Sequence, residues 1–367
     1  MRRYATFEVT RTAMKRLPGI RSATAATLMV AALISCGGES TEERAADAAS
    51  LQIKGAGATF PEPLYQEWIG RYRKGHPDVD FRYEGVGSGE GIDLFIAEEV
   101  DFGASDAAMN DAEIARVQRG VKLIPVTAGM VVLAYNLPGV EGDLKLPRDV
   151  VADIFLGKIW RWDDPRIAAA NPDLALPAKL IQVVARRDSS GTTYALTNYL
   201  GTISQAWREQ GPGTGKQIDW PKGAMTGSGN EGVAQKVKIS QGSIGYMEYG
   251  FARRLGLPIA VLENRSGNFV KPDAASGQAA LATAAVKLPE DLRLLLPDPE
   301  GPDSYPIVSL SWILLYARYA ELEKAAALKD ALTWGLTDGQ PIAEEMGYIP
   351  LPENITTKAT QAVTSIQ

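Results

Sequence analysis

The sequence predicts an α/β protein of two domains, in which helices cover the faces of a buried sheet. Its 367 residues exceed what one small core holds, and they are 45% hydrophobic and 22% charged, as in globular proteins. From Leu51 onward, short apolar runs of strand length alternate with amphipathic helical stretches. This alternation is typical of folds in which strands and helices follow one another.

The first half of this region is predicted to form strands separated by helices with one apolar face. The predicted strands cover residues 51–54, 79–83, 123–124 and 130–135. The first helix enters after Pro61 and Pro63, because proline is favoured in a first helical turn. Apolar residues at helical spacing mark the helices: Leu64, Trp68, Ile69 and Tyr72, then Ile92, Phe95 and Ile96, then Ile114 and Val117.

The second half continues in the same way, with interruptions rich in Gly and Pro at 211–215 and 296–302. The predicted strands are 180–185 and 307–316, and the predicted helices are 150–156, 194–200, 320–336 and 359–366. Whether the C-terminal tail forms a third unit or packs on the first is left open by the sequence.

Composition excludes several classes of site. A single cysteine excludes an intramolecular disulfide framework and every zinc or iron–sulfur site that needs several cysteines. The single histidine, His76, lies in a predicted turn facing solvent and is the one candidate base for a catalytic triad. The net charge of −6 argues against a nucleic-acid binder. We therefore predict no metal site and no cofactor.

The N-terminus predicts an exported lipoprotein. Residues 1–35 hold six basic residues and one acidic residue, and their apolar stretch 23–35 is shorter than the ~20 residues that span a bilayer. This signal peptide ends in Leu-Ile-Ser-Cys, which resembles a bacterial lipobox with Cys36 as the lipidated residue. Met14 is an alternative start, and a free cysteine in an N-terminal helix is the alternative interpretation of Cys36.

Removal of the signal peptide leaves a more acidic chain on a flexible tether. Without residues 1–35, 32 Lys and Arg face 43 Asp and Glu, so the net charge becomes −11. Residues 36–50 are small and polar and bury too little surface to order themselves. A lipid anchor and a tether together predict a globular body held at a membrane surface.

Four loops rich in Gly, Ser and Thr carry most of the functional information: residues 55–60, 85–91, 101–107 and 186–192. Three of them follow a predicted strand and open a predicted helix. Helix N-termini present unpaired N–H groups and partial positive charge, so they attract anions, and Arg186 adds a bidentate partner for an oxyanion. The alternative is that each loop only caps its helix.

These segments closely resemble the phosphate-binding protein of bacterial phosphate ABC transporters, a family of periplasmic binding proteins. The resemblance runs from Leu51 over nearly all of the remaining chain and is looser beyond about Leu322. It rests on these motifs in this order: GAGATFPEPLY (55–65), GVGSGEG (85–91), DFGASDA (101–107), FLGKIWRWDDPRI (155–167), RRDSSGTT (186–193) and SIGYMEYGFA (243–252).

The resemblance implies a type II two-lobed fold with the ligand in the cleft between the lobes. It places the first lobe at 51–129 and 304–367 and the second at 134–303. It also implies two kinds of partner: inorganic phosphate as ligand, and the membrane permease subunits of an ABC importer, whose ATPase is a separate chain.

The resemblance carries the family's phosphate-binding positions onto this sequence: Thr59, Phe60, Ser88, Asp106, Arg186, Asp188, Ser190, Gly191 and Thr192. Arg186 would pair with the anion, and Asp188 would hold the arginine in place. Asp106 would accept a hydrogen bond from the phosphate's own proton. Sulfate has no proton to donate, so a carboxylate here would disfavour it. Glu90, in the second loop, places a further negative charge near the site.

Competing motifs are weaker. Residues 227–232 fit the dinucleotide pattern G-x-G-x-x-G but follow no convincing strand, so they predict a helix entry, and 213–217 lack the full P-loop pattern. Asp163 and Asp164 lie beside tryptophans in a predicted surface turn.

Two alternative functions stay open: a secreted phosphatase or phosphoryl-transfer enzyme using Ser190 or Asp188, and a binder of another tetrahedral oxyanion such as sulfate. We expect a binding protein and no enzyme, because the sequence offers no dedicated cluster of metal ligands.

Overall fold

The structure of the protein, a computed structural model, describes residues 50–367. The predicted signal peptide, Cys36 and nearly all of the predicted tether lie outside the described residues. In residues 50–367, no helix combines the length and the hydropathy that crossing a membrane requires.

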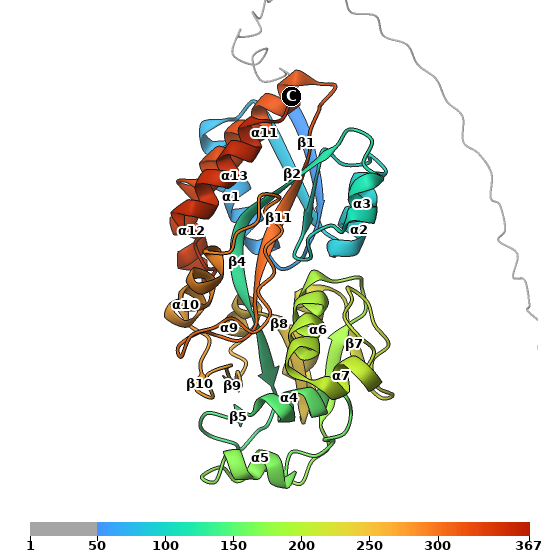
Figure 1. Ribbon diagram of the computed structural model, residues 1–367, viewed down its shortest axis with the longest axis vertical. Helices are drawn as coiled ribbons and strands as arrows, with labels where there is room; N and C mark the ends of the chain where they lie inside the picture. The colour runs from blue at the N-terminus through green and yellow to red at the C-terminus, as the bar shows by residue number, and fades with distance from the viewer. Residues whose placement is uncertain (1–49) are drawn as a thin grey trace, which may run out of the picture. The chain divides into compact units, whose positions relative to one another are not determined.

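An eight-stranded mixed sheet forms the centre of the fold (Figure 1). Its strands lie in the order β2 (Val79–Gly85), β1 (Leu51–Gly57), β3 (Phe102–Ser105), β11 (Val308–Tyr316), β4 (Val121–Tyr135), β8 (Ser243–Glu248), β6 (Gln182–Arg186) and β7 (Met225–Gly227). β1 and β6 run parallel to both of their neighbours, whereas β11 and β4 run antiparallel to theirs. The predicted α/β class is confirmed.

The long strand β4 belongs to two parts of this sheet. From Val121 to Met130 it pairs with β11, and from Val131 to Tyr135 it pairs with β8. We call β2, β1, β3, β11 and the first part of β4 the first lobe, and the last part of β4 with β8, β6 and β7 the second lobe. Figure 1 shows the first lobe above the second, with β4 running through both.

The prediction of two separate strands at 123–124 and 130–135 is wrong, because β4 continues through Pro125. Thr127 lies opposite Ser311 and Pro125 lies opposite Trp312, so β4 carries one extra residue between them. Such a bulge interrupts the hydrogen-bond ladder locally and can accommodate a residue that has no N–H to donate.

Helices cover both lobes. Those of the first lobe are α1 (Glu62–Gly75), α2 (Ser88–Ile96), α3 (Asp111–Ala115), α11 (Leu322–Leu336), α12 (Gly339–Met346) and α13 (Glu353–Thr364). Those between β4 and β11 in the chain are α4 (Arg148–Phe155), α5 (Pro165–Ala170), α6 (Gly191–Ile203), α7 (Gln205–Gln210), α8 (Gly229–Ile239), α9 (Tyr249–Arg254) and α10 (Ala274–Ala285). A small sheet, β10 (Phe269–Val270), β9 (Val261–Glu263) and β5 (Lys145–Leu146), completes the described elements. Helix α13 packs on β4 and α11, so the C-terminal tail does not form a third unit of its own.

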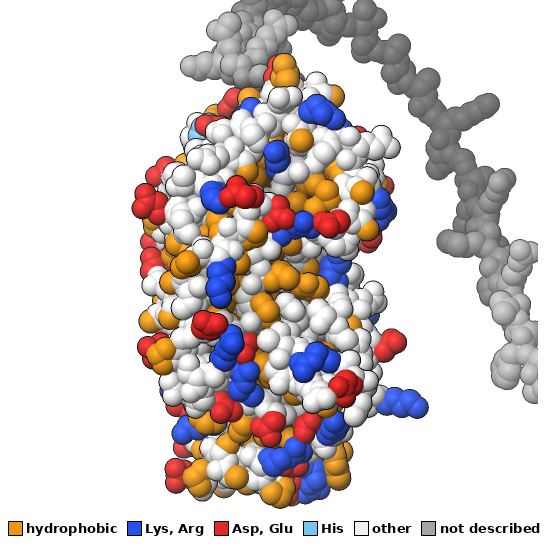
Figure 2. All heavy atoms as spheres, in the orientation of Figure 1, with side chains coloured by type: hydrophobic (Ala, Val, Ile, Leu, Met, Phe, Trp, Pro, Cys, Tyr) orange, Lys and Arg blue, Asp and Glu red, His pale blue; other side chains and the backbone are white. Residues whose placement is uncertain are grey.

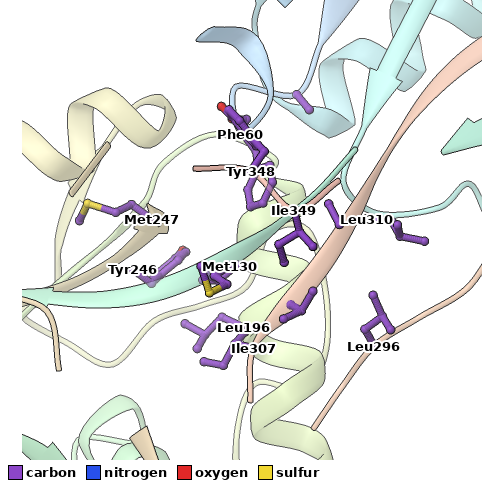
Figure 3. Packing of buried hydrophobic residues seen from close by; sticks show 14 of the residues in the cluster. Phe60, Met130, Leu196, Tyr246, Met247, Leu296, Ile307, Leu310, Tyr348 and Ile349 are labelled. Atoms are coloured by element: carbon purple, nitrogen blue, oxygen red, sulfur yellow. The ribbon is translucent and has the colours of Figure 1, made fainter. Parts of the chain in front are cut away.

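The apolar core includes β11 and the part of β4 that crosses from the first lobe to the second. Every residue of β11 is buried, as is β4 from Leu123 onward, which explains their continuous apolar sequences. Figure 3 shows Met130, Leu310 and Ile349 around this crossing. Ile349 exchanges two backbone hydrogen bonds with Ala128 of β4, at 2.8 and 3.2 Å.

The residue boundaries of the lobes stay a prediction. Helix α10 lies in the segment 134–303 that the sequence assigns to the second lobe, yet it contacts β11 as well as β4. The carbonyl oxygen of Ala285, at its end, accepts a hydrogen bond from Asn354 Nδ2 of α13 at 3.0 Å. This segment therefore also contacts the first lobe.

Candidate anion-binding site

Three of the four predicted loops lie at the ends of strands and open helices, as the sequence suggested. Phe60 precedes α1, Ser88 is the first residue of α2, and Ser190 is the N-cap of α6. Gly87, before α2, has a φ of 104°, a backbone conformation that L side chains rarely adopt. The prediction of a loop at 101–107 is wrong for most of its length, because Phe102–Ser105 form strand β3 between β1 and β11; Asp106 follows this strand directly.

These loops meet between the lobes. The backbone N–H of Gly89, in the first lobe, donates to the carbonyl oxygen of Ser189, in the second, at 3.0 Å. A Cβ on Gly191 would lie 2.5 Å from Ser88 Oγ and 2.6 Å from Asp106 Cβ, so only glycine permits this approach. The structure thus brings together the first turns of α2 and α6 and the Asp106 carboxyl.

Most of the predicted site residues are buried at this junction. The residues that are less than a tenth exposed are Thr59, Phe60, Ser88, Asp106, Arg186, Ser190, Gly191 and Thr192. Asp188 keeps 19% of its side chain exposed. Glu90, in the first turn of α2, is exposed to solvent.

Arg186 is held as a fixed cation by its own loop. Its Nε donates to Asp188 Oδ1 at 2.9 Å, its Nη2 donates to Asp188 Oδ2, and its Nη1 donates to Thr192 Oγ1 at 3.2 Å. The Arg186 side chain is only 1% exposed. Burial raises the pKa of Asp188, but the hydrogen bonds and charge of Arg186 outweigh it and leave that pKa below its usual value. The pair is therefore ionised at neutral pH.

The Asp106 carboxyl is buried and hydrogen-bonded. Its Oδ1 accepts from Ser311 Oγ at 2.8 Å, and its backbone N–H donates to Ser88 Oγ at 3.1 Å. Burial raises the pKa of Asp106 to about 7, although the hydrogen bond from Ser311 and the charge of Arg186 lower it in part. Near neutral pH this carboxyl can therefore either donate or accept a proton.

Two polar residues that no sequence pattern marked lie beside the candidate site residues. Ser311 lies in β11, whose apolar sequence predicted only a core strand, and its hydroxyl donates to Asp106. Asn230 lies in α8, and its Nδ2 donates to Thr59 Oγ1 at 2.9 Å and to Thr192 Oγ1 at 3.3 Å. The segment 227–232 does open a helix, as predicted, but no local signal marked Asn230 as part of the site.

Two tyrosine hydroxyls fix the backbone of the site loops. Tyr348 donates to the carbonyl oxygen of Phe60 at 2.8 Å, and Figure 3 shows the two side chains close together. The hydroxyl of Tyr246, in β8, accepts from the Arg186 backbone N–H at 3.0 Å.

In the part of the chain that the structure describes, the side chains that could act as a nucleophile or a base are not arranged as a catalytic group. Ser190 Oγ accepts from the Thr193 N–H at 3.1 Å and so serves as a helix cap. His76 is only partly exposed, since its ring stacks on Tyr72 with centroids 3.9 Å apart at the far end of α1. Within residues 50–367, no group of three or more His, Cys, Asp or Glu could hold a metal ion.

Comparison with known proteins agrees with this arrangement. Residues 42–338 match the family model described as the PBP superfamily domain. The phosphate-binding protein PstS of Pasteurella multocida (strain Pm70) is 42% identical over 83% of this chain and 88% of its own length. The protein of the same name from Methanocaldococcus jannaschii is 39% identical over 90% of each chain.

Solved structures share the fold at lower identity. A high-affinity periplasmic phosphate-binding protein (PfluDING), solved with phosphate, aligns with a TM-score of 0.69 at 21% identity, over 85% of this chain and 93% of its own. The phosphate-binding protein of Stenotrophomonas maltophilia aligns with a TM-score of 0.68 at 21% identity, over 85% and 94%. The architecture is thus the type II fold of periplasmic binding proteins. The chain belongs to the PBP superfamily and, within it, to the family of phosphate-binding proteins called PstS.

Proposed function

We propose that this protein captures inorganic phosphate outside the cytoplasm and delivers it to an ABC importer. The observation that supports it most is the buried Arg186–Asp188 pair beside two helix N-termini that meet from different lobes. A fixed guanidinium and helix N–H groups together favour an oxyanion. The relatives that share the fold and much of the sequence carry the name phosphate-binding protein.

In this proposal the anion lies between the lobes and takes hydrogen bonds from both. The first lobe would supply the backbone N–H groups of Thr59 and Phe60, the hydroxyls of Thr59 and Ser88, and Asp106. The second lobe would supply the Arg186 guanidinium. It would also supply hydroxyl and backbone N–H groups at the start of α6, from Ser190, Gly191 and Thr192. Asp188 would orient the guanidinium. The burial of these residues removes water, so each charged contact is stronger than it would be at a surface.

Selectivity would come from the proton on the ligand. Phosphate near neutral pH still carries a proton, and Asp106 can accept it or share it because its pKa is about 7. Sulfate carries none, and its oxygens would face the lone pairs of an ionised carboxylate. Sulfate binding is therefore expected to be the weaker of the two.

The cellular setting is proposed from the sequence. The body formed by residues 51–367 would be exported and held at a membrane surface by a lipid on Cys36. Its two lobes, 51–129 with 304–367 and 134–303, would close on phosphate, and the closed form would be recognised by permease subunits that work with a separate ATPase.

We also propose that the protein has no enzymatic role. The Ser190 hydroxyl already accepts a backbone hydrogen bond, and Asp188 is engaged with Arg186, so neither is arranged as a nucleophile beside a base. Incubation with a chromogenic phosphate ester tests this directly. Turnover that disappears in Ser190→Ala would favour a phosphatase instead.

Isothermal titration with phosphate, sulfate and arsenate is the decisive experiment for the binding function. We expect phosphate to bind, and arsenate to bind too because it is tetrahedral and protonated in the same way. Sulfate is expected to bind weakly or not at all. Binding of sulfate as tight as phosphate would exclude the proposed selectivity, and the absence of phosphate binding would exclude the function.

A further inference from the structure

Asn230 joins loops of the two lobes at the edge of the site. Its Nδ2 donates to Thr59 Oγ1, in the first lobe, at 2.9 Å, and its backbone N–H donates to the same oxygen at 3.2 Å. The same Nδ2 lies 3.3 Å from Thr192 Oγ1, in α6 of the second lobe. Asn230 is fully buried, so these hydrogen bonds are shielded from competing water. We call this set of contacts the Asn230 bridge.

The amide of Asn230 is fixed in one orientation by the second lobe. Its Oδ1 accepts from the backbone N–H of Glu248 at 2.9 Å, which leaves the NH2 group to face the two threonines. Glu248 is the last residue of β8 and lies opposite Val131, where β4 passes from one lobe to the other. The Asn230 bridge therefore links the site directly to the crossing between the lobes.

The start of α8 is also tied to the charged pair of the site. The backbone N–H of Gly229 donates to Asp188 Oδ1 at 2.9 Å, and Asp188 in turn holds Arg186. Gly229 has a φ of 65°, which few residues other than glycine adopt easily. The helix that carries Asn230 is thus positioned by the same carboxylate that orients the predicted anion-binding arginine.

A cavity of about 260 Å³ adjoins the Asn230 bridge. Thr59, Asn230 and Asp188 line it on the side of the site, and Glu62 and Glu231 also line it. The more deeply placed site residues Ser88, Asp106, Ser190 and Thr192 are not among its lining residues. Thr59 and Asn230 thus border both the site and this cavity.

We propose that the Asn230 bridge holds the site closed toward this cavity, so that breaking the bridge controls how fast bound phosphate leaves. This inference rests on the proposed function, because it assigns a role in the binding of phosphate. Asn230 acts here as a positioning residue: it joins Thr59 of one lobe to Thr192 of the other. An opening of the lobes has to separate Asn230 from Thr59, whereas the hydrogen bond to Glu248 stays within the second lobe.

The test measures the release of radiolabelled phosphate from the full chain after a chase with excess unlabelled phosphate. Asn230→Ala is expected to release phosphate about tenfold faster or more, since it removes two buried hydrogen bonds to threonine hydroxyls. Asn171→Ala is the matched control. Asn171 is also buried in the part of the chain that follows β4 and makes several hydrogen bonds, but to Lys145 and Ile167 away from the site. It should lower thermal stability and leave the release rate unchanged.

A double-mutant cycle with Thr59→Val separates the bridge from a general disturbance of the site. The effects of Asn230→Ala and Thr59→Val on the release rate should be less than additive, because either one removes the hydrogen bond from Asn230 Nδ2 to Thr59 Oγ1. If Asn230→Ala does not fold, Asn230→Asp takes its place in the cycle. It keeps the acceptor for the Glu248 N–H, loses the NH2 donors, and adds a charge that is common to both backgrounds.

The outcomes distinguish this inference from the proposed function. If wild-type protein binds phosphate but the two effects are additive, the proposed role of the Asn230 bridge is wrong and the proposed function stands. The same conclusion follows if Asn230→Ala changes the release rate by less than twofold. Wild-type protein that does not bind phosphate overturns both.

Discussion

The two lobes contribute different chemistry to one site. The second lobe provides a permanent positive charge on Arg186, which Asp188 holds in place. The first lobe provides a carboxyl whose pKa is about 7, Asp106, and the hydroxyls of Thr59 and Ser88. In the proposed site, attraction of the anion and recognition of its proton would be separate tasks, each carried out by one lobe.

This division explains how a chain with a predicted mature charge of −11 can bind an anion. On the face shown in Figure 2, Lys and Arg side chains are interspersed with Asp and Glu, and no extended basic surface is visible. In the proposed site the attraction would be local, because it would come from one buried guanidinium and from helix N-termini, where low dielectric strengthens each contact. Net charge by itself is a poor guide to the ligand.

Removal of the positive charge of the second lobe should have the largest effect on phosphate binding. Arg186→Ala is expected to weaken phosphate binding at least about 100-fold, because each hydrogen bond from a charged donor contributes about 1.5–3 kcal/mol. Isothermal titration measures the loss. Arg187→Ala is the matched control, since Arg187 is the adjacent arginine but is exposed and bonded to Ser228. If both variants bound phosphate alike, the second lobe would not be the source of attraction.

The carboxyl of the first lobe should leave a signature in the pH dependence of stability. Because the pKa of folded Asp106 is about 7, and that of an unfolded Asp is about 3.9, the unfolded chain loses this proton first as pH rises. The contribution of Asp106 to the free energy of unfolding without phosphate should therefore fall between about pH 4 and pH 7. Above that range it should change little.

Asp106→Asn isolates this contribution, because the variant keeps the other titrating groups. We expect its stability relative to wild type to rise by up to about 4 kcal/mol across the same pH range, at about 1.36 kcal/mol for each unit of pKa shift. Urea unfolding in phosphate-free buffer measures the free energy of unfolding of both proteins at several pH values. If the stability of Asp106→Asn ran parallel to that of wild type, the pKa of Asp106 would not be raised in the folded protein.

The smallest of the three effects is expected in selectivity. Asp106→Asn should narrow the preference for phosphate over sulfate by about tenfold or more, because an amide can donate a hydrogen bond to either anion. Competition between the two anions, followed by calorimetry, measures the ratio. An unchanged ratio would mean that the first lobe does not recognise the proton of the ligand.

Local sequence patterns predicted much of the fold and most of the candidate site. The helix entries at Ser88 and Ser190 and the strands before them lie where glycine, serine and threonine placed them, because capping depends on residues close in the chain. The bulge that lets β4 pass through Pro125 was missed, since it depends on how β11 pairs with β4. Whether the candidate residues bind phosphate stays a prediction.

Partners that are distant in the chain could not be predicted in the same way. Ser311 is 205 residues from Asp106, and Asn230 is 171 residues from Thr59. A serine in an apolar strand and an asparagine in the first turn of a helix have ordinary local explanations, so neither pattern marked them. Their roles depend on which loops the sheet brings together.

The sequence by itself determined the α/β class, three of the four loops and the presence of an arginine with an aspartate two residues later. Those features follow from the hydrogen-bonding and conformational preferences of neighbouring residues. Only the tertiary structure decided that the charged pair would be buried, that Asp106 would lie beside it with a raised pKa, and that Asn230 would join the lobes. Burial and charge–charge interactions depend on distances in space, and these are set by the packing of the whole sheet.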